Sequence, residues 1–342
     1  MELLCVGATR VFSKWALTLC LSPAFVCRES EGQSQSQSQS VKLQRSPQET
    51  LLVAGMNGEV VELDHDLQEV GRWTALAGAF NVLQAGRETD WTGKADASAH
   101  LIWTAGGDGC LRAWVRDECL SQAKPEGPDA TEESKPGAAL GDSAAVWSEA
   151  LCLFGPKKPI TAFWWGEAAG AFALGYERAL YHWSAPEAQP RKINGVASLE
   201  RLGQAWYGCP KTGAKAADIG PLAEFDPITG NFGTPVFDDG FAVWSLKPWD
   251  DRRLLAFGVD RRAWVVDPIM ARRQLIEWHC ESSGPGSLIL SNGSRLLYGE
   301  GAIVCDGIST DAPLRGLYGA VEWPRGRVLF AGADGQVWIF AL

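Results

Sequence analysis

The chain has 342 residues, enough for one large domain or two ordinary ones. Hydrophobic residues make up 46% of it and charged residues 21%, which is typical of a globular protein and excludes disordered, collagen-like and disulfide-scaffold chains. Lysine and arginine number 31 against 41 aspartates and glutamates, so the net charge is −10, which disfavours a nucleic-acid partner.

The N-terminal region predicts two strands, over residues 3–12 and 15–22. The longest apolar run, residues 15–27, is too short to cross a bilayer as a helix, so we expect no membrane span. Because Arg10 and Lys14 precede this run, residues 1–27 also suit a targeting segment, and that alternative stays open.

Six later segments repeat one pattern: an apolar strand, a glycine, a short turn and a second alternating strand. Turns such as Asn-Gly and Asp-Gly between apolar runs are strong β-hairpin signals, because these residues adopt the positive φ that tight turns need. The six segments are 51–64, 102–117, 171–183, 254–267, 295–307 and 328–342.

The spacing of these hairpins indicates a seventh, degenerate copy. Gly175 and Gly258 lie about twice as far apart as Gly258 and Gly299. Within that gap, residues 216–230 contain an Asp-Pro-Ile triplet that matches the one beginning at Asp267, and Ala217 falls where Gly258 does. We therefore expect seven units, with six as the alternative if this copy is wrong.

Two polar segments interrupt the repeats. Residues 28–48 include a Gln-Ser alternation, and residues 123–144 are rich in Pro, Gly, Ala, Glu and Asp. Neither can bury much apolar surface, so both are predicted to be disordered loop insertions within a single domain spanning residues 1–342.

Each hairpin is flanked by further strand-like runs. Runs at 80–83, 160–165, 241–246, 287–290 and 319–323 precede hairpins, and runs at 69–73, 151–154 and 274–279 follow them. Four short strands in about 40 residues form the blade of a β-propeller. The sequence therefore predicts an all-β propeller of seven four-stranded blades. Residues 3–12 would complete the last blade and protect its edge, and residues 15–22 would open the first.

Two of the hairpins resemble WD40 repeats: AGGDGCLRAWVRD at 105–117 and AGADGQVWIFAL at 331–342. The resemblance extends over nearly the whole chain, but the Gly-His pair and the terminal Trp-Asp of the family are not intact, so most of its Asp–His–Ser/Thr–Trp network is missing. It implies a propeller that serves as a protein-interaction scaffold. Residues 59–73 and 223–237 also look like quinoprotein-type blades, which are the second choice.

The sixteen tryptophans supply the candidate contact residues. Those on the hairpin strands are expected to pack between blades: Trp103, Trp114, Trp183, Trp264 and Trp338. Neighbouring strand residues face opposite sides, so one of Trp164 and Trp165 is expected to be less buried. Trp249 lies in a polar turn beside two arginines, a combination typical of binding hot spots. The candidate partner contacts are Trp164, Trp165, Trp249, Arg252 and Arg253; packing of these tryptophans onto their own blades is the alternative.

No motif specific for catalysis occurs in the sequence. The best acid–base candidates are loop aspartates that a propeller could gather around its channel, although such residues usually form turns: Asp238, Asp239, Asp250 and Asp251. We therefore expect no catalytic, cofactor-binding or metal-binding residues, no cofactor and no small-molecule substrate.

The favoured function is a non-catalytic scaffold, a WD40-like subunit that binds other protein subunits of a complex. The alternative is a propeller enzyme or small-ligand binder that uses the central channel. A third possibility is peripheral nucleic-acid contact through a basic spot formed by the arginine pairs at 252–253, 261–262 and 272–273. The nine cysteines lack C-x-x-C spacing and mostly lie in apolar runs, which indicates reduced thiols and a cytoplasmic or other reducing intracellular location.

Overall fold

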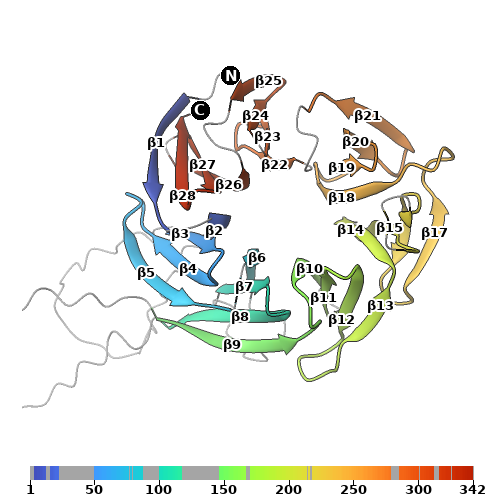
Figure 1. Ribbon diagram of the computed structural model, residues 1–342, viewed down its shortest axis with the longest axis horizontal. Coiled ribbons are helices and arrows are strands. Elements are labelled where there is room, and N and C mark those ends of the chain that lie inside the picture. The colour runs from blue at the N-terminus through green and yellow to red at the C-terminus, as the bar shows by residue number, and fades with distance from the viewer. Residues whose placement is uncertain are drawn as a thin grey trace, which may run out of the picture.

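The computed structural model describes a ring of antiparallel sheets (Figure 1). The described residues are 4–12, 16–22, 50–76, 78, 80–87, 100–117, 146–166, 170–213, 215, 218–278, 285–299, 301–311, 316–324 and 326–341. The predicted insertions at 28–48 and 123–144 lie outside them. No helix among the described residues is long and apolar enough to cross a membrane.

The first four blades each contain four strands in chain order. Blade 1 consists of β2 (Ala16–Ser22), β3 (Thr50–Gly55), β4 (Glu59–Leu63) and β5 (Glu69–Thr74). Blade 2 consists of β6 (Phe80–Arg87), β7 (His100–Gly106), β8 (Cys110–Asp117) and β9 (Val146–Phe154). Blade 3 consists of β10 (Ile160–Gly166), β11 (Gly170–Gly175), β12 (Ala179–Trp183) and β13 (Arg191–Asn194). Blade 4 consists of β14 (Val196–Leu202), β15 (Ala205–Pro210), β16 (Ala223–Asp226) and β17 (Asn231–Pro235).

The last three blades complete the ring. Blade 5 consists of β18 (Val243–Pro248), β19 (Leu254–Gly258), β20 (Ala263–Asp267) and β21 (Arg272–Ile276). Blade 6 consists of β22 (Gly286–Ile289), β23 (Arg295–Tyr298), β24 (Ala302–Cys305) and β25 (Ile308–Asp311). Blade 7 consists of β26 (Leu317–Trp323), β27 (Arg327–Gly332), β28 (Gln336–Ala341) and β1 (Leu4–Arg10). The predicted all-β propeller of seven four-stranded blades is confirmed.

The ring is closed by the N-terminal strand, as predicted. β1 pairs antiparallel with β28, from Leu4 opposite Ala341 to Arg10 opposite Gln336. The backbone N–H groups of Val11 and Phe12 then donate to the carbonyl of Gly335, and both side chains are buried. The two ends of the chain thus lie together on one blade (Figure 1), and β2 opens blade 1 beside it.

The degenerate fourth unit is present, but the residue predicted to end its second strand, in the position of Gly258, is wrong. In the pairing of β14 with β15, Val196 lies opposite Pro210, just as Val243 lies opposite Gly258 in the pairing of β18 with β19. Pro210 therefore takes the position that we assigned to Ala217. The matching Asp-Pro-Ile triplets were aligned correctly, since β16 ends at Asp226 and β20 ends at Asp267. The error arose because the connection from β15 to β16 is longer than in the other blades.

The innermost strands share a β-bulge near their first residues. In six of the seven blades the register of the first strand shifts within its first three residues, for example between Ile160 and Ala162 and between Val243 and Ser245. The shared register places Trp164, Glu200 and Lys247 at equivalent positions of neighbouring inner strands. These three side chains therefore lie at one level of the central channel.

Most of the core consists of apolar clusters between adjacent blades. The junction of blades 6 and 7, for example, contains nine buried side chains, including Leu296, Phe330 and Phe340. In blade 2, the copy that most resembles a WD40 repeat, the Trp114 indole donates to the Thr104 hydroxyl at 2.9 Å. That bond satisfies the Thr104 hydroxyl and explains why a threonine is fully buried there.

Candidate functional site

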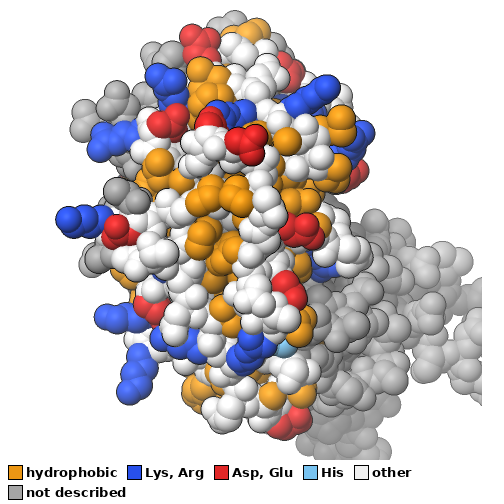
Figure 2. Space-filling model, turned by 90° about the vertical axis from the view of Figure 1, so that its right-hand side faces the viewer, with side chains coloured by type: hydrophobic (Ala, Val, Ile, Leu, Met, Phe, Trp, Pro, Cys, Tyr) orange, Lys and Arg blue, Asp and Glu red, His pale blue; other side chains and the backbone are white. Residues whose placement is uncertain are grey.

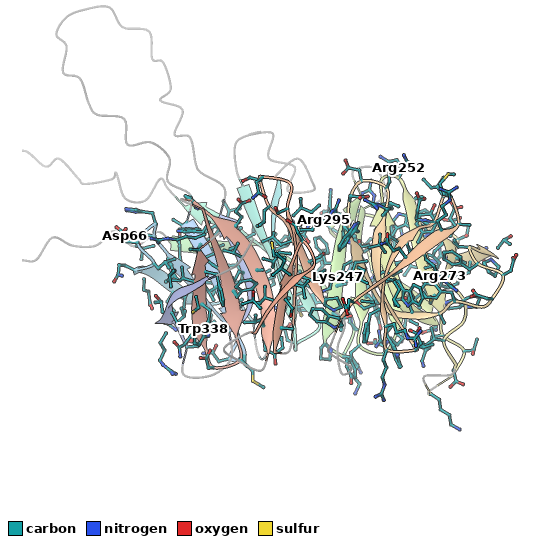
Figure 3. All side chains as sticks on the ribbon, turned by 90° about the horizontal axis from the view of Figure 1, so that it is seen from above. Asp66, Lys247, Arg252, Arg273, Arg295 and Trp338 are labelled. Carbon is teal, nitrogen blue, oxygen red and sulfur yellow. The ribbon has the colours of Figure 1, made fainter. Side chains whose placement is uncertain are left out.

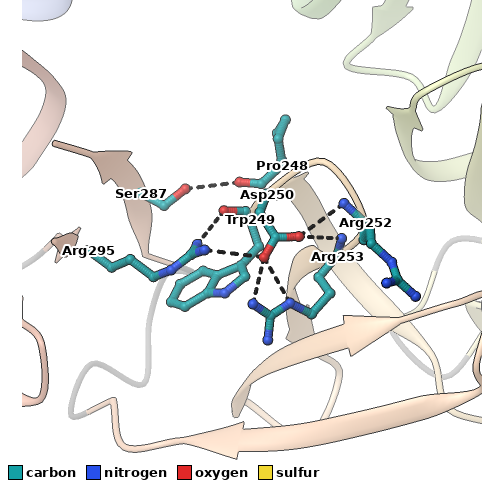
Figure 4. A network of polar contacts seen from close by, with 7 residues as sticks. All are labelled: Pro248, Trp249, Asp250, Arg252, Arg253, Ser287 and Arg295. Carbon is teal, nitrogen blue, oxygen red and sulfur yellow. Dashed lines mark hydrogen bonds and ion pairs between the residues drawn. The ribbon is translucent and has the colours of Figure 1, made fainter. Parts of the chain in front are cut away.

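The turn from β18 to β19 is organised by one carboxylate. Asp250 Oδ1 accepts the backbone N–H groups of Arg252 and Arg253 at 3.0 and 2.8 Å, which fixes the turn. Its Oδ2 accepts Nε and Nη2 of the Arg253 guanidinium at 2.8 and 2.6 Å (Figure 4). Burial opposes ionisation of Asp250, but these hydrogen bonds outweigh it and hold the pKa of the carboxyl below its usual value.

A second arginine reaches this turn from the neighbouring blade. Arg295, the first residue of β23, donates from Nη1 to the carbonyl of Trp249 at 2.5 Å and from Nη2 to Asp250 Oδ2 at 3.2 Å. Its guanidinium lies 4.6 Å from the centre of the Trp249 ring, within cation–π range. Ser287 also donates to the Pro248 carbonyl (Figure 4). Blades 5 and 6 therefore hold Trp249 in place jointly.

The apolar core beneath this turn is thin. Among the described residues, the cluster between blades 5 and 6 contains only three buried side chains, Leu255, Leu297 and Val304. Trp249, Ile276 and Trp278 pack against it and are only partly buried. Polar contacts across the junction therefore replace part of the apolar packing found between the other blades.

A cavity of about 410 Å³ opens at the same junction. Trp249, Arg253 and Arg295 line one part of it, and a second part is lined by aliphatic side chains of both blades: Val265, Leu275, Ile276, Leu297 and Val304. Polar residues complete the lining: Gln274, Glu277, Asp306 and Ser309. Leu275 is 49% exposed, although it is a large aliphatic side chain. We call this cavity and its lining the 5/6 groove.

The outer side of blade 5 carries further exposed apolar side chains. Ile269 and Met270, in the turn from β20 to β21, are 67% and 50% exposed. Figure 2 views the ring from the side of blades 4 and 5 and shows hydrophobic side chains gathered between scattered charged ones. The 5/6 groove therefore adjoins a rim that is apolar in part.

The structure separates the two predicted groups of contact residues. Trp249 and Arg253 line the groove, and Arg252, in the same turn, is exposed beside them (Figure 4). Trp164 and Trp165 lie on β10, away from it, and both are half-buried. The Trp164 indole donates to Glu200 Oε1 at 2.7 Å, and Trp165 stacks on Trp103. These two tryptophans take part in packing between blades.

The acid–base candidates do not share a site. The turn of Asp250 and Asp251 and the loop of Asp238 and Asp239 lie at opposite ends of β18. Asp239 forms an ion pair with Arg273 on β21, the outermost strand of blade 5, so this carboxylate lies at the rim and does not line the channel. These four carboxylates therefore do not form one group, and at least Asp250 and Asp239 act in their own turn and loop contacts.

The arginine pairs of blade 5 also fail to form one basic patch. The turn that holds Arg252 and the turn that holds Arg261 and Arg262 lie at opposite ends of β19. Arg253 and Arg273 are engaged in ion pairs with Asp250 and Asp239. Figure 3 shows Arg252 at one face of the ring and Arg273 at its outer side.

The central channel contains one pair of charged groups with altered pKa values. Lys247, which is labelled in Figure 3, lies on β18, the innermost strand of blade 5 (Figure 1), and its side chain is exposed to water. Surrounding protein lowers the pKa of its ammonium, against the attraction of Glu200. Burial likewise raises the pKa of the Glu200 carboxyl, although hydrogen bonds from Arg201 and Trp164 oppose this. Across the described part of the chain, no group of three or more His, Cys, Asp or Glu residues could hold a metal ion.

Two residues of the groove, Arg295 and Leu275, are not among the contact residues predicted from the sequence. Arg295 begins a repeat strand and looked like an ordinary surface residue, since its contact with Trp249 joins positions 46 residues apart on different blades. Leu275 was assigned to a strand, and its exposure depends on how widely blades 5 and 6 separate. Neither property has a local sequence signal.

Comparisons with known proteins identify the fold. No protein-family model matches the sequence, and no curated protein sequence matches it. Among solved structures, the chain is similar to the WD40 β-propeller domain of Doa1, with a TM-score of 0.57 and 11% sequence identity, over 99% of this chain and 97% of that one. The protein thus has the fold of a WD40 propeller.

Proposed function

We propose that this protein is a non-catalytic interaction scaffold, a subunit of a larger protein complex that docks a partner chain in the 5/6 groove. The observation that carries the proposal is the Trp249–Arg295 pair, held from two blades beside a cavity with an aliphatic wall. Tryptophan and arginine are the residues most enriched at binding hot spots. Because Asp250 and Arg295 already fix the indole, a partner loses little affinity to ordering it.

The groove also has the composition expected of a docking surface. Its lining combines aliphatic and aromatic side chains with arginines and other polar groups, the mixture usual in protein interfaces. Of the residues predicted from the sequence, Trp249, Arg252 and Arg253 belong to this proposed surface, and Arg295 and Leu275 extend it. A WD40-type ring supplies a rigid frame for such a surface, and this supports the proposal by analogy of fold alone.

The test is affinity purification of the tagged full chain from its native cells at low salt, with crosslinking and mass spectrometry. Wild type is compared with two groove variants, Trp249→Ala and Leu275→Glu. The control is Tyr176→Ala, which removes a 68% exposed aromatic residue on blade 3. We expect a stoichiometric partner crosslinked near the groove, retained by the control and reduced at least tenfold by each groove variant.

Leu275→Glu is included so that a loss of binding can be told apart from a loss of folding. Trp249→Ala removes part of the junction, whereas Leu275 is half exposed, and its replacement leaves the three buried side chains intact. The melting temperature of each variant is measured alongside. Equal partner recovery from wild type and Leu275→Glu, or a monomer without crosslinks, would contradict the proposal.

A small-ligand site in the central channel is the second candidate function. Its support is the pair formed by Lys247 and Glu200, two groups with perturbed pKa values at one level of the channel. A carboxylate ligand that raises the melting temperature of wild type but not that of Lys247→Met would establish it.

A further inference from the structure

The two arginines of the 5/6 groove carry more N–H donors than Asp250 can accept. A guanidinium carries five N–H donors. Arg253 directs two of them to Asp250 Oδ2, and Arg295 directs one to the same oxygen and one to the Trp249 carbonyl. That carboxylate also accepts two backbone N–H groups of its own turn. Its capacity is used up, while each guanidinium retains N–H groups for a further acceptor.

The other acidic residues of the groove do not supply that acceptor. The Asp306 carboxylate accepts the backbone N–H of Arg295 at 2.8 Å and a hydrogen bond from the Ser294 side chain, and it attracts the Arg295 guanidinium without forming an ion pair with it. Glu277 follows the end of β21 and is exposed, and among the described residues both arginines form their ion pairs with Asp250 and none with Glu277. The two arginines therefore favour an acceptor brought by the occupant, and a carboxylate fits their planar fork best.

The remaining walls set the shape of the occupant. Four consecutive residues that include the end of β21, Gln274 to Glu277, line the groove, so one of its sides follows an extended strand. β21 is the outermost strand of blade 5, with one backbone edge unpaired in its sheet. Unpaired edges accept extended segments by main-chain hydrogen bonding. The exposed Leu275 and its aliphatic neighbours offer a place for apolar side chains.

We propose that the occupant of the 5/6 groove is an extended segment of a partner protein that alternates aliphatic and acidic side chains. Its carboxylate binds the free N–H groups of Arg253 and Arg295, and its aliphatic side chains lie against Leu275, Ile276 and Leu297. This inference rests on the proposed function, because it specifies the chemistry of the partner that docks there.

The test measures fluorescence anisotropy of three labelled peptides titrated with the full chain. The acidic probe is Gly-Ser-Leu-Glu-Leu-Glu-Leu-Gly-Ser, and the other two have lysine or glutamine in place of both glutamates. We expect the acidic peptide to bind at least tenfold more tightly than the lysine peptide, with the glutamine peptide between them. Binding should weaken as NaCl rises from about 50 to 300 mM, because salt screens exposed charges.

Two groove variants and one control variant test whether the acidic peptide binds in the 5/6 groove. Leu275→Glu and Arg253→Gln should each weaken the acidic peptide at least tenfold, and Tyr176→Ala should leave it unchanged. Absent binding of the acidic peptide, equal binding of the lysine peptide, or insensitivity to both groove variants would overturn the inference.

A competition experiment separates this inference from the function on which it rests. If the natural partner is lost in Leu275→Glu but is not displaced by the acidic peptide, the scaffold function stands and the proposed occupant is wrong. If the peptide binds at the groove but purification finds no partner there, the groove chemistry stands and the scaffold function fails.

Discussion

Individual tryptophans in this ring differ in role according to what the indole contacts, either through its N–H group or through its ring face. Trp114 donates to Thr104 within its own blade, whereas Trp147 on blade 2 donates at 3.1 Å to Glu62 on blade 1. Trp249 is held by an arginine above its ring. The two hydrogen bonds satisfy buried polar groups, whereas the cation–π contact leaves the Trp249 ring only partly buried. Burial of the partner therefore distinguishes a structural tryptophan from a candidate contact.

Among single residues, the raised pKa of the Glu200 carboxyl predicts that the stability of the protein depends on pH. Burial raises the pKa of its carboxyl from the ordinary value of 4.5, and hydrogen bonds and Lys247 offset this only in part. A raised native pKa gives stability that is present below pH 4.5 and lost as the pH rises through the native value. Glu200→Gln keeps an acceptor for Trp164 but no ionisable proton, so we expect it to raise the melting temperature at pH 7–8 and to change it little near pH 4.

Thermal unfolding from pH 4 to pH 8 checks this prediction. Glu224→Gln, at an exposed position on β16 of the same blade, is the matched control and should leave the melting temperature unchanged throughout. A Glu200→Gln variant less stable than wild type at pH 7–8 would show that the attraction of Lys247 exceeds the cost of burial.

At the scale of elements, local turn chemistry made the central hairpins predictable. In the hairpin of β3 and β4, Gly58 has a φ of 82°, and a Cβ atom there would lie 2.0 Å from the Leu76 carbonyl oxygen, so the turn requires glycine. The last residue of β15, Pro210, could not be predicted from turn chemistry. This residue is a proline and a long connection follows it, so neither glycine nor spacing marked the strand end.

Besides its backbone pairing with β20, the outermost strand of blade 5 is anchored by the side chain of Arg273. The Arg273 guanidinium lies 5.0, 4.5 and 5.2 Å from the ring centres of Phe237, Phe241 and Trp264, and it forms an ion pair with Asp239. Its hydrogen bonds hold the pKa of the Asp239 carboxyl below its usual range. β21 is thereby fastened to β20 and to the loop that leads into β18.

Arg273→Lys keeps the charge but loses the planar face that stacks on the three rings. We expect the free energy of unfolding to fall by about 1–2 kcal/mol, measured by urea denaturation. Arg272→Lys, at the exposed neighbouring position, should change it by less than about 0.5 kcal/mol. Equal effects of the two substitutions would show that the aromatic contacts do not stabilise the strand.

For the whole molecule, the candidate site depends on how two blades meet. The turn with Trp249, Arg252 and Arg253 could be predicted, because an aromatic residue among charged ones stands out in a local window. The seam between blades 5 and 6 could not, since it reflects side chains from β19, β21, β23 and β24 that meet only in the closed ring. Closure by β1 could be predicted although its partners lie at the other end of the chain, because the first strand was surplus and the last blade lacked one strand. The contact of Arg295 with Trp249 had no comparable signal.

Closure of the ring by β1 gives the prediction at this scale. Deletion of residues 1–12 would expose the edge of β28 and remove Val11 and Phe12 from the apolar cluster between blades 7 and 1. We expect a lower melting temperature and self-association by size-exclusion chromatography, because an unpaired edge strand pairs with other chains. A synthetic peptide of residues 4–12 should restore the monomer and part of the stability by adding a strand. A scrambled peptide should do neither, since it cannot match the alternation of side chains on β28. A stable monomer after the deletion would mean that three strands suffice for blade 7 and that β1 is not needed to close the ring.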